Sequence, residues 1–276
     1  MELHSAVERN NYEEVEELLK GQIQVNYEDN NWYCGTPLMK ACFDDNIGIV
    51  SLLLEDGRVQ VNKQDSQGSS ALHIACQNAH MDIVELLMKN ANVDVLLCNY
   101  ASAVPFHLAC RTGHFYLVEM MMRDRRIDVN GSMEDGATPL YICCEFGHWD
   151  LVNLLLEDKR VDVNKQMNEG QTALWIACHY GYLNIVKEFF KSKRVLNFNA
   201  SWIGNNKNAA EEAKHKGHKA VSNLLSQYML SNKNHFQRFF ESQCLLGRVE
   251  IRHQNLRDQV ALMGSHFNLH RIKYLG

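Results

Sequence analysis

Cysteine and histidine are the residues of this 276-residue chain that offer the most varied chemistry. The chain has nine cysteines and thirteen histidines, and thiolate and imidazole groups are the side chains that bind zinc. No two cysteines have the C-x-x-C spacing of a structural zinc site. His266 and His270 would share one helix face, but no matching carboxylate or thiol is apparent beside them. We therefore expect no metal site.

Sequence motifs for catalysis and for nucleotide binding are also missing. The chain has no G-x-S-x-G nucleophile motif, no P-loop and no glycine pattern for a dinucleotide. We therefore expect no catalytic residues, no cofactor and no enzyme activity. The net charge of −5 argues against nucleic acid as the main partner. No apolar run approaches the ~18 residues of a membrane span, so we expect no membrane partner.

A short stretch that recurs every 34 residues organises the chain. Its copies begin at positions 36, 70, 104, 138 and 172, and the first reads Thr-Pro-Leu-Met-Lys-Ala-Cys. Four copies begin with Ser or Thr, whose hydroxyl accepts a hydrogen bond from the free N–H groups of a starting helix. The chain's three prolines, Pro37, Pro105 and Pro139, follow at the position that proline favours. A fixed period in this range predicts a solenoid of stacked units.

The repeated unit resembles the ankyrin repeat. After a T-P-L-H-x-A-A helix, that family has Gly-His, a second helix of the I-V-x-x-L-L type, and Asp-Val-Asn leading into a β-hairpin. Here the fourth repeat has Gly147-His148, a second helix around residues 151–155, and then Asp162-Val163-Asn164. The resemblance implies a mainly α ankyrin-repeat solenoid of helix-turn-helix units with projecting β-hairpin loops. It also implies that the histidines of the Gly-His position close the turn between the two helices by hydrogen bonds. These are His80, His114, His148 and His218.

The register of the repeats divides the chain into four parts. We expect an N-terminal capping half repeat at 1–20, five ankyrin repeats at 21–190, a degenerate C-terminal capping repeat at 191–230 and a basic helical tail at 231–276. The tail has seven basic and three acidic residues, whereas the preceding 230 residues have 21 and 30. It either finishes the cap with extra helices, docks on the acidic remainder or recruits a separate acidic partner.

The projecting loop of the third repeat departs from the pattern. Residues 96–102 lack the turn glycine of the other fingers, and Val104 replaces the capping Ser or Thr. Loss of the cap should cost about 1 kcal/mol of helix stability. Such a departure marks either a functional surface or drift in an exposed loop.

Five cysteines share one repeat position, where the ankyrin family has a small residue. We interpret Cys42, Cys76, Cys110, Cys144 and Cys178 as buried, reduced thiols that pack as small hydrophobic side chains. Equivalent positions of stacked repeats lie ~8–10 Å apart, whereas a disulfide requires Cα atoms within ~7 Å, so we expect no cross-links.

Two further cysteines bear on the compartment. Cys34 and Cys98 fall in predicted hairpins, where exposed free thiols fit a reducing environment. The first residues, Met1 to His4, lack the basic and apolar regions of a secretory signal. We therefore expect a cytoplasmic protein, with the nucleus as an alternative.

Asparagine recurs in the Asp-Val-Asn turns. The resemblance implies that such an asparagine can be a target of asparaginyl hydroxylases, and Asn62 and Asn164 each follow a leucine by eight residues. Asn130 has Met122 at that place. The alternative is purely structural, because asparagine side chains hydrogen-bond the backbone of their own turns.

The resemblance implies protein binding through a concave groove formed by the finger tips and the first helices. We predict a protein-protein interaction scaffold, with an adaptor or substrate receptor whose tail recruits a second factor as the alternative. A small ligand or nucleotide stacking on Trp32, Tyr100 or Arg111 is a weaker alternative. The predicted partner-binding residues are Trp32, Tyr33, Phe43, Asp44, Gln77, Asn78, Tyr100, Arg111, Glu134, Asp135, Glu145, Phe146, His179 and Tyr180.

The acidic residues of the fourth repeat suggest what the partner is like. Glu134, Asp135 and Glu145 lie among aromatic groove residues. We therefore expect a monomeric protein whose unidentified protein partner has an apolar centre and a basic flank.

Overall fold

A computed structural model of the chain describes residues 2–30, 35–198 and 200–229. Trp32, Tyr33 and Cys34 lie outside these ranges, and so does the predicted tail at 231–276. The chain divides into two compact units, Met1–Val161 and Asp162–Gly276, which we call unit 1 and unit 2.

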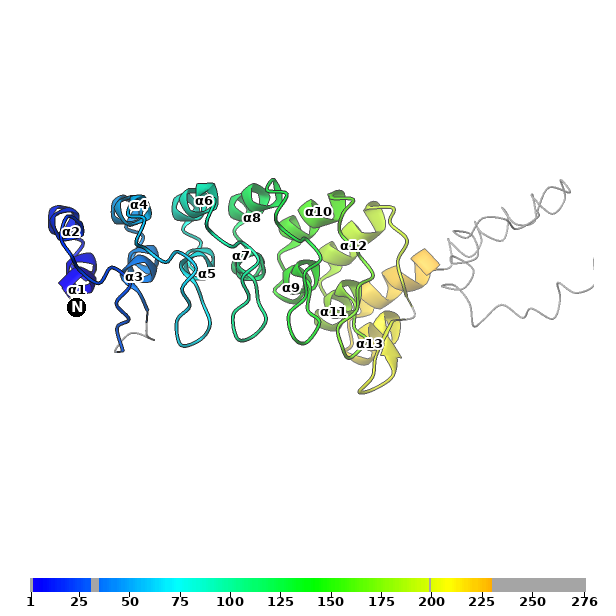
Figure 1. Cartoon of the computed structure of the whole chain (residues 1–276). Coiled ribbons are helices and arrows are strands. Elements are labelled where there is room, and N and C mark those ends of the chain that lie inside the picture. Colours follow the sequence, from blue (N-terminus) through cyan, green and yellow to red (C-terminus); the bar gives the residue numbers. More distant parts are fainter. Residues whose placement is uncertain (1, 31–34, 199, 230–276) are drawn as a thin grey trace, which may run out of the picture. The chain divides into compact units, whose positions relative to one another are not determined.

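The described part of unit 1 is a row of helix pairs (Figure 1). The first helices of the pairs form one layer and the second helices form another, and each helix packs against its equivalents in the neighbouring pairs. Finger-like loops project beyond the layer of first helices. The helices are α1 (Glu2–Glu8), α2 (Tyr12–Leu19), α3 (Pro37–Phe43), α4 (Ile47–Glu55), α5 (Ala71–Gln77), α6 (Met81–Lys89), α7 (Pro105–Thr112), α8 (Phe115–Met122), α9 (Pro139–Glu145) and α10 (Trp149–Glu157).

Unit 2 contains two helix pairs and a strand pair within its described residues. The elements are α11 (Ala173–Tyr180), α12 (Leu183–Lys191), β1 (Ser201–Trp202), β2 (Lys207–Asn208), α13 (Ala209–His215) and a last helix that includes residues 219–229. Strands β1 and β2 are antiparallel, with Ser201 opposite Asn208. The indole Nε1 of Trp175 donates to the Lys207 carbonyl at 2.9 Å, which ties this hairpin to α11.

The predicted caps are present where Thr begins the repeated stretch. The hydroxyl of Thr36 accepts a hydrogen bond from the Met39 N–H at 3.3 Å, and Thr138 accepts one from Tyr141 at 3.2 Å. Val104 offers no side-chain cap, as its sequence predicts. Each cap replaces one of the hydrogen bonds that the first turn of a helix lacks.

The mainly α repeat solenoid that the sequence predicts is confirmed, but the fingers carry less strand structure than expected. Among the described residues, β1–β2 is the one strand pair, and the bridges Asp29–Gly35 and Gln166–Thr172 are isolated. The other fingers of unit 1 are turns. A backbone hydrogen bond closes the base of each of them: Asp65 N–H to Ser69 O, Asn99 N–H to Ala103 O, and Met133 N–H to Ala137 O, at 2.9, 2.9 and 3.0 Å. A second one lies within each turn, from Gly68, Ser102 and Gly136 to the carbonyls of Asp65, Asn99 and Met133.

The repeating cysteines are buried, as predicted: four in unit 1 and Cys178 in unit 2. Burial raises the pKa of the Cys42, Cys76 and Cys178 thiols well above the usual value. These thiols therefore stay protonated at neutral pH and act as packing groups, not as nucleophiles. Cys98 is exposed, as predicted.

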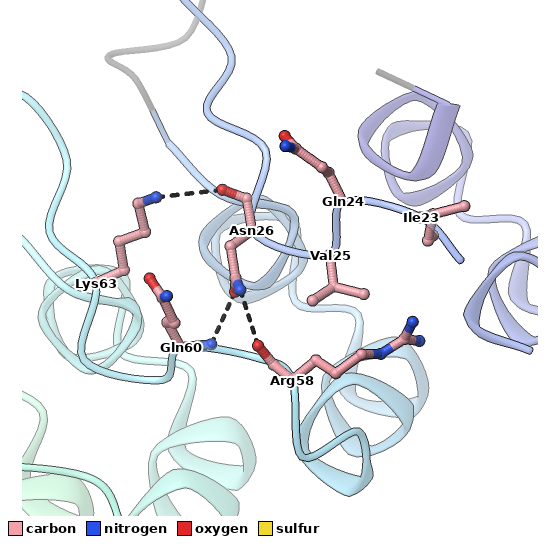
Figure 2. Close-up of a pocket in the computed structure, with 7 residues that line it drawn as sticks. All are labelled: Ile23, Gln24, Val25, Asn26, Arg58, Gln60 and Lys63. Carbon is pink, nitrogen blue, oxygen red and sulfur yellow. Dashed lines mark hydrogen bonds between the residues drawn. The ribbon is translucent and has the colours of Figure 1, made fainter. Parts of the chain in front are cut away.

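Asparagine side chains connect the bases of neighbouring fingers. The Nδ2 group of Asn62 donates to the Asn92 carbonyl at 2.7 Å. Asn26 donates to the Arg58 carbonyl at 2.8 Å and accepts from the Gln60 N–H at 2.7 Å (Figure 2). The interpretation that these amides bond their own turn is wrong, because their partners lie 30 to 34 residues further on, in the next repeat. Hydroxylation of the asparagines stays a prediction.

Two histidines that precede second helices of unit 1 also reach another repeat. In unit 1, the Nε2 of His80 bonds to the Phe43 carbonyl at 3.2 Å, and that of His148 bonds to the Arg111 carbonyl at 3.0 Å. Because a carbonyl accepts, Nε2 carries the hydrogen in both rings. The expected closure within one repeat is found at His114, whose Nδ1 accepts from an N–H of its own second helix. His80 and His148 thus connect neighbouring repeats.

Candidate functional site

The predicted groove residues of unit 1 lie at the ends of first helices and on the fingers. Each first helix is followed by a residue in the left-handed backbone conformation: Asn10, Asp45, Ala79, Gly113 and Gly147, with φ of 52°, 60°, 58°, 76° and 76°. This conformation ends the helix and turns the chain toward the second helix. At Gly113 the ring of His148 leaves no space for a Cβ atom. The last turn of each first helix is thereby held at the surface.

Three aromatic rings at predicted groove positions are exposed in unit 1. Phe43, Tyr100 and Phe146 are 46%, 73% and 49% exposed. The Lys40 ammonium lies 5.5 Å from the centre of the Phe43 ring and forms an ion pair with Asp44 at 2.9 Å. Exposed aromatic rings held by such contacts are suited to anchor a protein partner.

Tyr100 joins the second and third fingers. Its backbone N–H donates to the Gln67 carbonyl at 3.1 Å. A Cβ atom on Gly68, which has φ of 76°, would lie only 2.7 Å from the Tyr100 ring. The ring therefore rests on the second finger and presents its remaining surface to solvent.

The polar groove positions of unit 1 differ in how much they are free to bind. Gln77 and Arg111 are exposed, whereas the Asn78 amide is engaged with the Ile74 carbonyl of its own helix at 2.9 Å. These side chains line the surface between the aromatic positions of the first and fourth repeats.

The acidic positions gather in the fourth repeat. Glu134 and Asp135 are exposed on the finger, and Glu145 is half-buried at the end of α9. Burial raises the pKa of the Glu145 carboxyl, and the nearby charge of Asp135 raises it further. A carboxylate that is both desolvated and close to a like charge is stabilised by an incoming cation.

The two groove positions in unit 2 have different roles. Tyr180 is 45% exposed, and its ring stacks on Tyr182 with centroids 5.6 Å apart. His179 is engaged internally, because its Nδ1 lies 3.0 Å from a carboxylate oxygen of Glu212. Glu212 is only 1% exposed and also accepts from the Asn205 side chain at 3.0 Å. Sequence reasoning missed this pairing.

A register signal for Glu212 exists in the sequence. At the offset of 36 residues that aligns the last repeat, Glu212 takes the place of Ile176, and the earlier repeats have Ile142, Leu108 and Ile74 there. A carboxylate at a core position requires a polar partner. His179 and Asn205 supply it.

A pocket of about 380 Å³ lies in unit 1 at the base of the first fingers (Figure 2). Its two cations are already engaged. Lys63 forms an ion pair with Glu28 at 2.7 Å, and the Arg58 guanidinium donates to the Gly21 and Leu19 carbonyls at 2.9 and 2.7 Å. The pocket therefore lies between repeats, and both of its cations are already engaged by other groups of the protein.

The described ranges contain no group of three His, Cys, Asp or Glu side chains that could hold a metal ion. None of the helices in these ranges is both long enough and apolar enough to span a bilayer. Trp32 and Tyr33, the two aromatic positions predicted on the first finger, lie outside the described residues.

Comparisons with known proteins agree with this geometry. A family model described as ankyrin repeats (3 copies) matches residues 3–97, 93–167 and 150–236. The crystal structure of the ankyrin repeat domain of Bcl-3, a member of the IkappaB protein family, has a TM-score of 0.71 at 24% identity, covering 82% of this chain and 98% of that one. The ankyrin repeat protein EF0377 has a TM-score of 0.64 at 27% identity, covering 75% and 99%. No curated protein matches.

Proposed function

Because this chain belongs to the ankyrin repeat family, whose members are generally non-enzymatic modules for protein-protein interaction, we propose that it is a scaffold that binds a partner protein through the groove positions of unit 1. The partner would have an apolar centre and a basic flank. We further propose that the protein is monomeric and acts in the cytoplasm or the nucleus, where its exposed Cys98 thiol would stay reduced.

The exposed aromatic rings support this proposal most strongly. Phe43, Tyr100 and Phe146 are each at least 46% exposed at positions that recur along the repeats. An exposed aromatic ring held by its neighbours loses little conformational entropy on binding and buries a large apolar area.

The basic flank of the partner follows from the fourth repeat. Glu145 has a raised pKa because it is partly buried and because Asp135 lies near it. A lysine or arginine from a partner would relieve this repulsion and stabilise the ionised carboxylates.

Affinity capture from native lysate tests the groove. Tyr100→Ala combined with Phe146→Ala should lower the recovery of true partners by about tenfold or more, because aromatic anchors carry most of the binding energy. Ile203→Ala in unit 2 is the control, since Ile203 is as exposed as Tyr100, at 73%, but is not among the predicted partner-binding residues. Recovery of every partner at unchanged levels from the double variant would show that the groove assignment is wrong.

The adaptor alternative rests on the charge contrast within the chain. Residues 231–276 carry a net charge of +4 and the remainder carries −9. Deletion of 231–276 should remove a subset of captured proteins and leave the melting transition intact if the tail recruits a second factor. A lower or broader transition would instead indicate that the tail completes the C-terminal cap.

A further inference from the structure

A second exposed surface of unit 1 lies beyond the predicted groove positions. The second helices α2, α4, α6, α8 and α10 all begin with a large apolar residue, namely Tyr12, Ile47, Met81, Phe115 and Trp149. We call this row, together with Tyr116, the helix-start edge. Trp149 and Tyr116 are 56% and 67% exposed, and Tyr12 and Ile47 are each 46% exposed. Single exposed apolar residues are ordinary, but a row at one repeat position marks an interaction surface.

Contacts along the helix-start edge hold its rings in place. The Tyr12 ring packs over α4, where a Cβ atom on Gly48 would lie 3.5 Å from it. The rings of Phe115 and Tyr116 meet edge to face, with centroids 5.5 Å apart. The edge is therefore preformed, and little side-chain entropy would be lost when a partner covers it.

The charges around the helix-start edge are mainly negative. Residues 45–48, 79–82, 113–116 and 147–150, which form the turns and helix starts of this edge outside the predicted groove residues, include three acidic residues and no lysine or arginine. Asp82 and Asp150 form no ion pair with any described residue. The helix dipole offsets part of the charge in a first turn, but such an edge still repels an anionic membrane surface and attracts a cationic protein segment.

Aromatic rings beside carboxylates favour cationic side chains in a second way. A lysine or arginine over the face of a Trp or Tyr ring gains cation–π attraction, and Trp is the best of these rings. Trp149 and Tyr116 are the most exposed rings of the edge. Asp150 directly follows Trp149 in the chain. Consecutive residues of a helix do not face each other, so separate cations of one segment would meet the ring and the carboxylate.

The spacing of the row indicates the conformation of the segment that fits it. Equivalent residues of neighbouring helices lie ~8–10 Å apart. Seven residues of an α-helix advance ~10.5 Å, whereas two residues of a strand advance only ~6.8 Å. We propose that the helix-start edge of unit 1 binds an amphipathic helix of a partner protein, with apolar side chains at seven-residue intervals and lysine or arginine beside them. This contact is additional to the groove.

Fluorescence anisotropy with the full chain tests the proposal. The probe is a labelled synthetic helical peptide with leucine at every seventh position and lysine on the flanks. We expect it to bind, and we expect Trp149→Ala with Tyr116→Ala to weaken binding by about tenfold or more. Replacing the flanking lysines of the peptide by glutamate should weaken binding to a similar extent. A second variant, Asp82→Asn with Asp150→Asn, should weaken binding of the lysine peptide while leaving both rings and all groove residues in place.

The groove variant Tyr100→Ala is the matched control and should leave the affinity for the peptide within about twofold. If Tyr100→Ala weakens binding and the Trp149 and Tyr116 changes do not, the peptide occupies the groove and the inference is wrong, while the proposed groove function stands. Failure of the peptide to bind, equal binding of the lysine and glutamate peptides, or stronger binding to phosphatidylserine vesicles than to the peptide would also overturn it.

Discussion

The third and fourth fingers of unit 1 take equivalent places but are stabilised differently. In the fourth, Gly136 adopts a left-handed conformation with φ of 91°, and Thr138 caps α9. Arg126, held by Asp124 at 2.7 Å, donates to the Met88 carbonyl at 2.7 Å. Every local feature of this finger favours the conformation that it adopts.

The third finger reaches the same backbone shape without these residues. Ser102 takes the glycine position with φ of 56°, Val104 replaces the cap, and Asn92 stands where the fourth finger has arginine. At the helix start the His107 N–H, from which a capping hydroxyl would accept, donates instead to the Val104 carbonyl at 3.0 Å, and the His107 Nδ1 accepts from the Val104 N–H at 3.1 Å. From the preceding repeat, His73 bonds to the finger backbone. A neighbouring repeat can therefore impose a conformation that the local sequence disfavours.

The largest expected effect comes from the buried core of the third and fourth repeats. Phe106 and its fourth-repeat equivalent, Leu140, are 0% and 1% exposed. Phe106→Ala should lower the free energy of unfolding by about 3–5 kcal/mol and Leu140→Ala by about 2–5 kcal/mol, because each leaves a cavity. Urea unfolding measures both. A loss below about 1 kcal/mol for Phe106→Ala would show that the third repeat is packed less tightly than the fourth.

The next test exchanges the residues at the left-handed position. Gly136→Ala should destabilise the protein by about 1–2 kcal/mol, since a Cβ disfavours positive φ. Ser102→Gly should recover up to about 1 kcal/mol in the third finger. Gly57→Ala is the matched control, because nothing lies within 4 Å of its Cβ position and its φ is not positive. Equal effects of Gly136→Ala and Gly57→Ala on thermal unfolding would contradict the account.

A smaller exchange concerns the helix caps. Thr138→Val should cost about 1 kcal/mol through loss of the hydroxyl that accepts from Tyr141. The reverse change, Val104→Thr, should gain less than about 1 kcal/mol, because the His107 N–H that a capping hydroxyl would bind already donates to the Val104 carbonyl at 3.0 Å. Urea midpoints of both variants measure the difference. A gain from Val104→Thr as large as the loss from Thr138→Val would show that the Val104 carbonyl does not replace the cap.

The smallest expected effect is a dependence of stability on pH. Burial lowers the pKa of His73 below its usual value of 6.5. The neutral ring fits, because Nδ1 accepts from the Ser70 N–H at 3.1 Å while Nε2 faces the Ala103 carbonyl at 3.0 Å. Below pH 6.5 the unfolded chain binds more protons than the folded chain, so stability falls as the pH falls and is unaffected above this window.

Urea unfolding of the wild type and of His73→Gln at a series of pH values measures this effect. Glutamine keeps a donor and an acceptor but does not titrate. The wild type should lose more stability than the variant on acidification. Burial also lowers the pKa of His4. This histidine is present in both proteins and therefore acts as an internal reference. Identical pH profiles would exclude His73 as the source.

Sequence reasoning succeeded where one repeat determines its own structure. Thr36 and Thr138 cap helices as predicted, and the repeating cysteines are buried. It failed where the question was which repeat a polar side chain bonds. Asn62 and His80 carry no sign in the sequence of whether they turn toward their own repeat or the adjacent one. That choice depends on the distance between repeats, which a period alone does not state.

The candidate site shows the same division. The exposure of Phe43, Tyr100 and Phe146 agrees with the predicted groove register, although their role in binding stays a prediction. The engagement of His179 by Glu212 was not foreseen, because the two residues are 33 positions apart and meet only when the helices pack.

The histidine hydrogen bonds between repeats have a consequence for how such a protein can evolve. His80, His148 and His218 bond to the backbone carbonyls of Phe43, Arg111 and His179, whose side chains occupy the groove positions. Every residue type supplies that carbonyl, so the architecture does not constrain which side chain is displayed. Selection can thus alter the recognition surface one residue at a time. A duplicated repeat would already contain the histidine and the carbonyl that form the hydrogen bond to its neighbour.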